Sequence, residues 1–154
     1  MNFHLNGSKV KASVPNHALL VDFIRDTEGL TGTHIGCDTS QCGACNILLN
    51  GEAVKSCSIF VVQVDGKSVE TIESLASSNK LHPMQQAFHD HHGLQCGFCT
   101  PGMIMSGIGI AKRRGVASRE EIRKDLEGNF CRCTGYNTIV DSIEAGIKAM
   151  AKKG

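Results

Sequence analysis

The chain has 154 residues, which suits one domain or two small ones, and 41% of them are hydrophobic, enough for a buried core, which excludes a disordered chain. Its formal net charge of +1 excludes the strongly basic surface that binds nucleic acids or anionic membranes. No stretch of the sequence approaches the length of about eighteen consecutive apolar residues that a membrane span requires. The start, MNFHLNGSKV, has no signal-peptide pattern, so we expect a cytoplasmic protein.

Residues 1–77 are predicted to form strands around one short helix. A two-residue hairpin signal occurs at Asn6-Gly7, the segment NILLNGEAVKSCSIFVVQV repeats it at Asn50-Gly51, and Asp65-Gly66 predicts another turn. Between the two hairpins, HALLVDFIRDTEGL places its apolar side chains on one helical face, and Gly29 marks the end of this helix. The pattern predicts a small α+β domain.

Residues 78–154 are predicted to be helical. Thr100 is expected to cap a helix, followed by Pro101 at its first position, and Gly115 marks its end. Ser118 has Glu121 three residues on, which is a capping box. Four helical segments, expected to form a small bundle, begin at HPMQQ, TPGMI, SREEI and TGYNT.

Eight cysteines in a chain without an export signal indicate metal binding, because cytosolic thiols are kept reduced and disulfides are improbable there. The first four have the spacing C-x4-C-x2-C, then eleven residues, then the fourth, which is the plant-type [2Fe–2S] spacing. A structural zinc site is a poorer match, since zinc ribbons prefer paired C-x2-C knuckles. Gly36 and Gly43 would allow the backbone to wrap closely around the cluster. These four cysteines are Cys37, Cys42, Cys45 and Cys57.

The second four cysteines have the spacing C-x2-C, thirty-one residues, then C-x-C. Residues two apart do not share a helix face, so Cys131 and Cys133 are expected in a loop. Each cysteine pair precedes a predicted helix start, and helix N-termini favour an anionic centre. An iron–sulfur cluster is preferred, although the spacing alone leaves a zinc site closed by two helical hairpins as an alternative. These four are Cys96, Cys99, Cys131 and Cys133.

The motifs GCDTSQCGAC, the later SC, LQCGFCTPGM and NFCRCTGY together resemble the iron–sulfur subunit of the molybdenum hydroxylases, the xanthine oxidase family. The resemblance covers residues 3 to 150. Within this family, the chain is most similar to the small subunit of aerobic carbon monoxide dehydrogenase. It implies an N-terminal β-grasp plant-type ferredoxin domain in residues 1–77 and an all-α four-helix-bundle [2Fe–2S]-binding domain in residues 78–154.

The resemblance also implies roles and partners. The helical domain holds the proximal cluster, next to the molybdopterin of a large subunit, and the ferredoxin-like domain holds the distal cluster, nearer the FAD of a medium subunit. Gln95 and Cys133 would contact the pterin, which is expected as the cytosine dinucleotide, in a dimer of heterotrimers. No residue of this chain is expected to be catalytic, so it would be the non-catalytic electron-transfer subunit of an oxidoreductase.

Several readings stay open. The whole enzyme is expected to oxidise carbon monoxide, but the related hydroxylases of aldehydes, purines and N-heteroaromatic compounds share the same motifs. A freestanding two-cluster ferredoxin would carry electrons among several enzymes and purify without molybdenum. A zinc-stabilised interaction module would have no redox spectrum.

Overall fold

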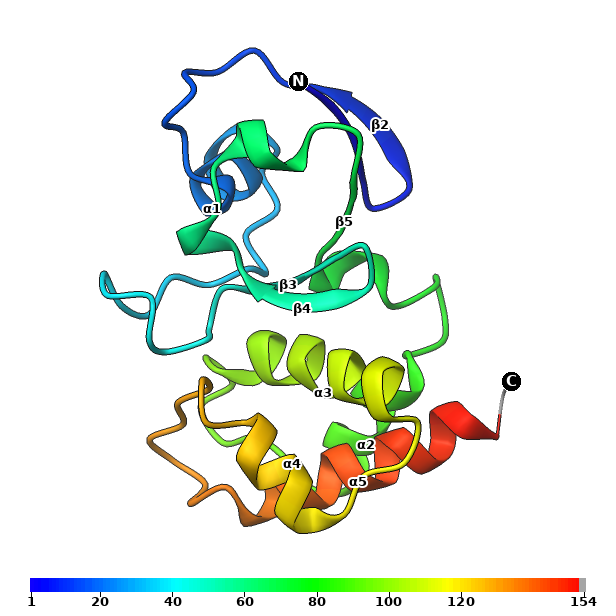
Figure 1. Ribbon diagram of the computed structural model, residues 1–154. Coiled ribbons are helices and arrows are strands. Elements are labelled where there is room, and N and C mark those ends of the chain that lie inside the picture. Colours follow the sequence, from blue (N-terminus) through cyan, green and yellow to red (C-terminus); the bar gives the residue numbers. More distant parts are fainter. Residues whose placement is uncertain (153–154) are drawn as a thin grey trace.

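The computed structural model describes residues 1–152 and arranges them as a sheet half and a helical half, with the N-terminus in the first and α5 at the end of the second (Figure 1). None of the helices in this described part is long and apolar enough to cross a membrane. The expected segment 78–154 includes two residues, 153 and 154, that lie outside the described part.

Five strands form one sheet in the order β2-β1-β5-β3-β4. β1 pairs in parallel with β5, and the other neighbours are antiparallel. The sheet and its helix give the α+β arrangement expected of the first half. The strands are β1 (Asn2–Leu5), β2 (Ser8–Lys11), β3 (Asn46–Leu49), β4 (Glu52–Lys55) and β5 (Ser68–Glu70).

Both predicted hairpins are confirmed. Asn6 and Gly7 have φ of 52° and 82°, and Asn50 and Gly51 have φ of 50° and 87°. Positive φ at both turn residues matches the right-handed twist of the flanking strands. The second hairpin joins β3 to β4, with Leu49 opposite Glu52.

The helix expected between the hairpins forms as α1 (Leu20–Asp22), which continues as a π-helical turn through Thr27. The strand pattern expected to run on after β4 is wrong for Val61–Val64, which forms a 3-10 helix. Val61 and Val64 are buried three residues apart, and the Gln63 side chain accepts a hydrogen bond from the Phe60 backbone. Burial at this spacing favours a helical turn over an extended strand.

The second half of the described chain contains the helices α2 (Pro83–Asp90), α3 (Thr100–Arg114), α4 (Arg119–Asp125) and α5 (Asn137–Ala151). The capping box of Ser118 and Glu121 is confirmed, as is the end of α3 at Gly115. The capping role expected of Thr100 is wrong, because Cys99 occupies the N-cap and the Thr100 hydroxyl is buried without a hydrogen-bond partner among the described residues.

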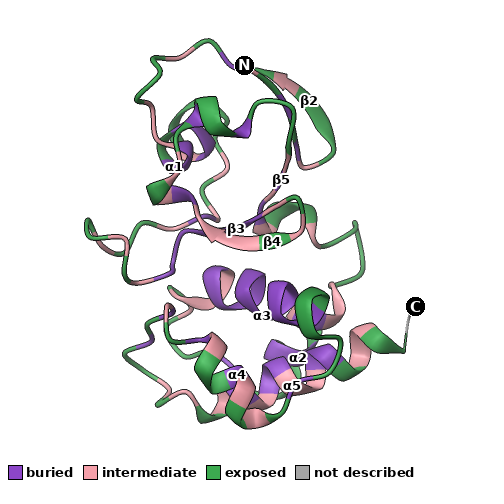
Figure 2. Cartoon of the chain, in the orientation of Figure 1, coloured by how far each residue is buried: buried purple, intermediate pink, exposed green. Residues whose placement is uncertain are grey.

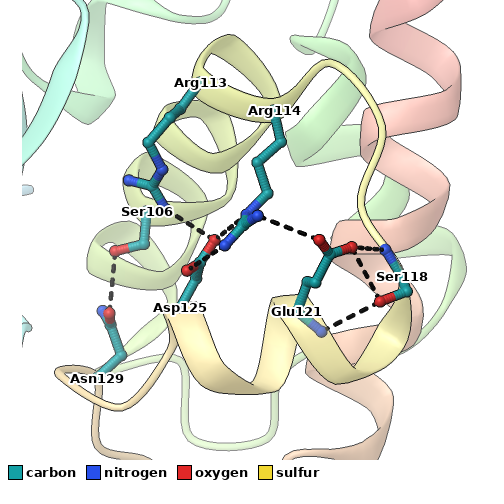
Figure 3. A network of polar contacts seen from close by, with 7 residues as sticks. All are labelled: Ser106, Arg113, Arg114, Ser118, Glu121, Asp125 and Asn129. Carbon is teal, nitrogen blue, oxygen red and sulfur yellow. Dashed lines mark hydrogen bonds and ion pairs between the residues drawn. The ribbon is translucent and has the colours of Figure 1, made fainter.

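Ion pairs tie the end of α3 to α4 (Figure 3). Arg114 donates two hydrogen bonds to the Asp125 carboxylate, at 2.6 and 3.0 Å, and Arg113 lies 2.7 Å from the same carboxylate. Both arginines lower the pKa of Asp125, and Arg114 has the larger effect. Arg113 and Arg114 are thereby paired within the helical half, whereas Lys112 of the same turn lies 4.0 Å from Glu70 of β5.

The hydrophobic core passes through β3 from one half to the other. Ile47 packs with the sheet and α1, whereas Leu48, on the opposite face of the same strand, packs with the helices. α3 lies directly against β3 and β4, and most of it is buried (Figure 2). Full burial of a side chain such as Leu48 contributes about 1.5–3 kcal/mol.

Candidate metal centres

The first cysteine set, Cys37, Cys42, Cys45 and Cys57, lies where the β3–β4 hairpin returns to its starting point. Cys45 directly precedes β3, and Cys57 lies in the 3-10 turn that follows β4. The hairpin register pairs Asn46 with Lys55, which brings the two cysteines side by side. Ser56 closes the contact, because its hydroxyl donates to the Cys45 carbonyl at 2.8 Å. The fourth cysteine is thus brought to the first three by a short-range hairpin.

Backbone N–H groups in this loop point at thiol sulfurs. The Cys42 N–H lies 3.4 Å from the Cys37 sulfur, and the Ala44 N–H lies 3.5 Å from the Cys42 sulfur. The first of these hydrogen bonds, helped by other backbone groups of the loop, lowers the pKa of the Cys37 thiol to about 6. A loop that favours thiolate at neutral pH suits a metal ligand.

The two glycines of this loop have different roles. Gly43 has φ +73°, the left-handed conformation that glycine was expected to allow. Gly36 has no such φ, so the expectation fails for it. Instead, a Cβ atom there would lie 3.1 Å from both the Cys42 sulfur and the Phe98 ring. Gly36 therefore keeps space open beside a sulfur.

The second cysteine set joins two loops of the helical half. Cys96 and Cys99 lie between α2 and α3, and Cys131 and Cys133 lie between α4 and α5. All four line one cavity of about 200 Å³, and Cys42 of the first set lies in the same wall. The predicted loop position of the C-x-C pair is confirmed. Cys99 is the N-cap of α3, whereas α5 begins later than expected, after a left-handed Tyr136.

The eight thiols are free and neighbour one another in pairs. Burial, assisted by the neighbouring Cys57 thiol, raises the pKa of Cys45 to about 11. Burial, assisted by the neighbouring Cys131 thiol, raises the pKa of Cys99 to about 12. The paired thiols are Cys37 with Cys42, Cys45 with Cys57, Cys96 with Cys133, and Cys99 with Cys131.

This pairing fits iron–sulfur clusters better than single ions. Each iron of a [2Fe–2S] cluster takes two thiolates, so four cysteines are needed as two pairs. A structural zinc ion instead needs four donors around one point. Within residues 1–152, no group of three His, Cys, Asp or Glu side chains is placed to hold one metal ion.

The two pairs of the second set differ in exposure. Cys131 is buried, whereas Cys96 and Cys133 are exposed, as is Gln95. Burial favours a higher pKa for Cys131, but hydrogen bonds from Thr134, together with Cys133 and Cys99, lower that pKa. Large apolar side chains near the exposed pair are also solvent-accessible, and these are Leu94, Phe98 and Phe130.

One residue near these centres was missed by sequence reasoning. His34 donates from Nδ1 to the Phe98 carbonyl at 2.7 Å, and the two rings stack with centroids 4.8 Å apart. This contact links the segment before the first cysteine to the loop between Cys96 and Cys99. A lone histidine sixty-four residues away in sequence carries no local signal for such a contact.

Comparison with known proteins agrees with these two centres. Residues 3–79 match the family model of a 2Fe-2S iron-sulfur cluster binding domain, and residues 71–144 match that of a [2Fe-2S] binding domain. Caffeine dehydrogenase subunit gamma of Pseudomonas sp. (strain CBB1) is 45% identical over 144 residues, which are 92% of this chain and 86% of that protein. Nicotine 6-hydroxylase small subunit of Paenarthrobacter nicotinovorans is 43% identical, with 93% and 86% covered.

A solved structure extends the agreement to the whole fold. Quinoline 2-oxidoreductase from Pseudomonas putida 86 contains a chain that matches with a TM-score of 0.93 and 42% identity. The match covers 100% of this chain and 96% of that one. The resemblance seen in the cysteine motifs is therefore confirmed, and the chain belongs to the family of small iron–sulfur subunits of the molybdenum hydroxylases.

Proposed function

We propose that this chain passes electrons from the molybdopterin centre of a large subunit to FAD on a medium subunit. The observation that carries the proposal is the presence of two separate four-cysteine sets, each arranged as two thiol pairs, in one packed chain. When bound, each [2Fe–2S] cluster would accept and release one electron. The chain itself would catalyse no bond change.

The chain's residues would hold each cluster and shape its surroundings. In the first set, the N–H groups of Cys42 and Ala44 would stabilise negative charge on the sulfurs. In the second, the Thr134 hydroxyl lies 3.3 Å from the Cys131 sulfur and would donate to the thiolate. The proposed ligands are Cys37, Cys42, Cys45 and Cys57 for one cluster, and Cys96, Cys99, Cys131 and Cys133 for the other.

The exposed end of the second set supports its proposed place beside the pterin. Cys96 and Cys133 reach the surface together with Gln95, so a partner chain could approach these three residues directly. Exposed Phe98 and Phe130 add apolar area of the kind that protein interfaces bury. We therefore keep the predicted pterin contacts of Gln95 and Cys133, and place the first set on the flavin side.

The same proposal includes the organisation of the assembly. Residues 1–77 would form the ferredoxin-like unit and residues 78–154 the cluster-binding helical unit, with α2 to α5 as its bundle. The molybdopterin cytosine dinucleotide and FAD would belong to partner chains in a dimer of heterotrimers. The similarity to subunits of multi-chain dehydrogenases supports separate partners.

For the substrate of the whole enzyme, we propose an N-heteroaromatic compound. Three similar proteins are named for caffeine, nicotine and quinoline, all of which contain a nitrogen heteroaromatic ring. Carbon monoxide, the first expectation from the sequence, is kept as the second candidate because of the motif HIGCDTSQCGAC.

The test is to purify the native complex through a tag on this chain and measure iron, molybdenum, flavin and zinc. About four iron atoms per chain with one molybdenum and one flavin are expected. Four iron atoms without molybdenum and flavin would indicate a freestanding ferredoxin instead. Zinc in place of iron would overturn the electron-transfer function.

The same complex then decides between substrates. Flavin bleaching under anaerobic conditions is measured after addition of quinoline, nicotine, caffeine, benzaldehyde or carbon monoxide. Bleaching by at least one heteroaromatic compound, and none by carbon monoxide, is expected. The reverse result would replace the proposed substrate class.

A further inference from the structure

We propose that a close backbone contact among Gly43, Gly102 and Gly128 fixes the spacing between the two cysteine sets, and thereby the coupling between the redox groups that they hold. This inference rests on the proposed function. The three glycines are positioning residues, because none of them bears a ligand. Each belongs to a different segment, and each segment carries at least one cysteine of the two sets.

The contact is too close for a side chain at Gly43 or Gly102, whereas Gly128 contributes its carbonyl oxygen. A Cβ atom on Gly43 would lie 2.5 Å from the Gly128 carbonyl oxygen and 2.7 Å from the side-chain nitrogen Nδ2 of Asn129. A Cβ atom on Gly102, in the first turn of α3, would overlap the carbonyl oxygen of Gly43. The overlapping atoms belong mostly to the backbone, which cannot rotate aside as a side chain can. A methyl group at Gly102 therefore pushes the start of α3 away from the backbone of Gly43.

The three segments meet close to the ligands. Gly43 directly follows Cys42, and Gly102 lies one helical turn beyond Cys99. Near Gly128, the Phe130 N–H donates to the Cys42 carbonyl at 2.8 Å. Because Phe130 directly precedes Cys131, this hydrogen bond connects Cys42 of the first set with Cys131 of the second.

A chain of buried hydrogen bonds also connects the same segments. Asn46, which follows Cys45, donates to the Ser106 hydroxyl at 2.7 Å, and that hydroxyl donates to Asn129 at 3.1 Å. Figure 3 shows Ser106 on α3 directed towards Asn129. All three are at most 8% exposed. Because these buried groups are shielded from water, removal of one of them leaves its hydrogen-bond partners unsatisfied.

These features together make the spacing rigid. The two loops touch through backbone atoms, are bonded to each other, and are fixed to one helix by Ser106. A close-packed interior resists continuous deformation. Because electronic and magnetic coupling both decrease with distance, a contact that sets the separation also sets the coupling.

The experiment uses the tagged complex with Gly102→Ala, and Gly107→Ala as the matched control. Gly107 lies in the same helix, but the atoms nearest to its Cβ, at 3.1 Å, would be side-chain atoms of Ile143 and Met84. The readouts are iron content and the magnetic splitting between the two clusters in EPR spectra of the dithionite-reduced complex. For Gly102→Ala we expect full iron, a smaller splitting and slower flavin reduction, because electron transfer slows as the redox groups move apart.

A second pair of variants decides the matter where Gly102→Ala does not fold. Ser106→Ala breaks the buried polar chain, whereas Ser142→Ala removes a fully buried hydroxyl that donates to the Thr138 carbonyl within α5. A smaller splitting in Ser106→Ala alone supports the inference.

Wild-type splitting in either Gly102→Ala or Ser106→Ala, with full iron, would overturn it. An equal loss of splitting in the control variants would overturn it as well, because general loosening would then explain the effect. Failure of the proposed function would appear separately, as a wild-type complex without two iron–sulfur signals.

Discussion

The two cysteine sets reach similar pairings by different routes. The first is formed almost entirely by one loop and the hairpin after it, and its own backbone N–H groups are directed at its sulfurs. The second joins loops that are thirty-one residues apart, and only the packing of helices brings them together. The comparison shows that a metal site can be encoded locally or by the tertiary fold, and the two kinds should respond differently to substitution.

The largest effect is expected from removing one ligand of each set. Cys42→Ser and Cys133→Ser should each reduce iron from about four to about two atoms per chain, because a cluster needs all four thiolates. Substrate-driven flavin reduction should decrease by more than about 100-fold in both, which exceeds the effect typical of outer-shell changes. Iron analysis and EPR of the reduced complex measure which signal disappears.

The two ligand variants should differ in which of the two signals they lose. Cys133→Ser leaves the local first loop intact, so the spectrum of that cluster should stay normal, and Cys42→Ser should likewise spare the second. Loss of both signals from one substitution would mean that the sets are not independent. Normal flavin reduction in Cys133→Ser would contradict the proposed route.

Sequence reasoning succeeded where the signal is local. The turns at Asn6-Gly7 and Asn50-Gly51, the capping box at Ser118 and the spacing of the first cysteines all depend on neighbours in the chain. The four cysteines of the second set lie together in one cavity, as predicted, and their spacing favoured an iron–sulfur cluster while leaving zinc as an alternative.

The failures have a common physical cause, which is tertiary contact. Val61–Val64 looks like a strand, but burial of two valines favours a helical turn. Thr100 has the chemistry of a cap, yet its hydroxyl is buried one residue inside the helix. The stacking of His34 on Phe98 depends on how the two halves meet, which no local pattern reports.

An intermediate effect is expected in the core that joins the halves. Leu48→Ala and Ile47→Ala remove similar apolar volume from opposite faces of β3, and each should cost about 2–5 kcal/mol in the free energy of unfolding. Because the strand is shared, both should lower the midpoint of the same thermal transition. Far-UV circular dichroism and the visible absorbance of the clusters measure it.

Two separate transitions, with Ile47→Ala affecting one and Leu48→Ala the other, would contradict a shared core. The sheet and the helices would then unfold as independent bodies, and the contact through β3 would contribute little to stability.

The smallest effect is expected from the hydroxyls next to the sulfurs. Ser40 lies 3.5 Å from the Cys57 sulfur, and Thr134 lies 3.3 Å from the Cys131 sulfur. A hydrogen bond to a thiolate stabilises the reduced cluster, so Ser40→Ala and Thr134→Val should each lower one reduction potential by on the order of tens of millivolts. Redox titration followed by EPR should show each variant shifting only its own cluster. A shift of the other cluster, or an increase, would exclude the hydrogen-bond explanation.

The exposed pair of Cys96 and Cys133 has a consequence for how the enzyme matures. If the large subunit covers this face, as proposed, the cluster behind it must be inserted while the small subunit is still alone. A chain that docked empty would have its entrance sealed. Before docking, the same entrance leaves the cluster open to oxidants, so the partner would serve as a protective lid as well as a source of electrons.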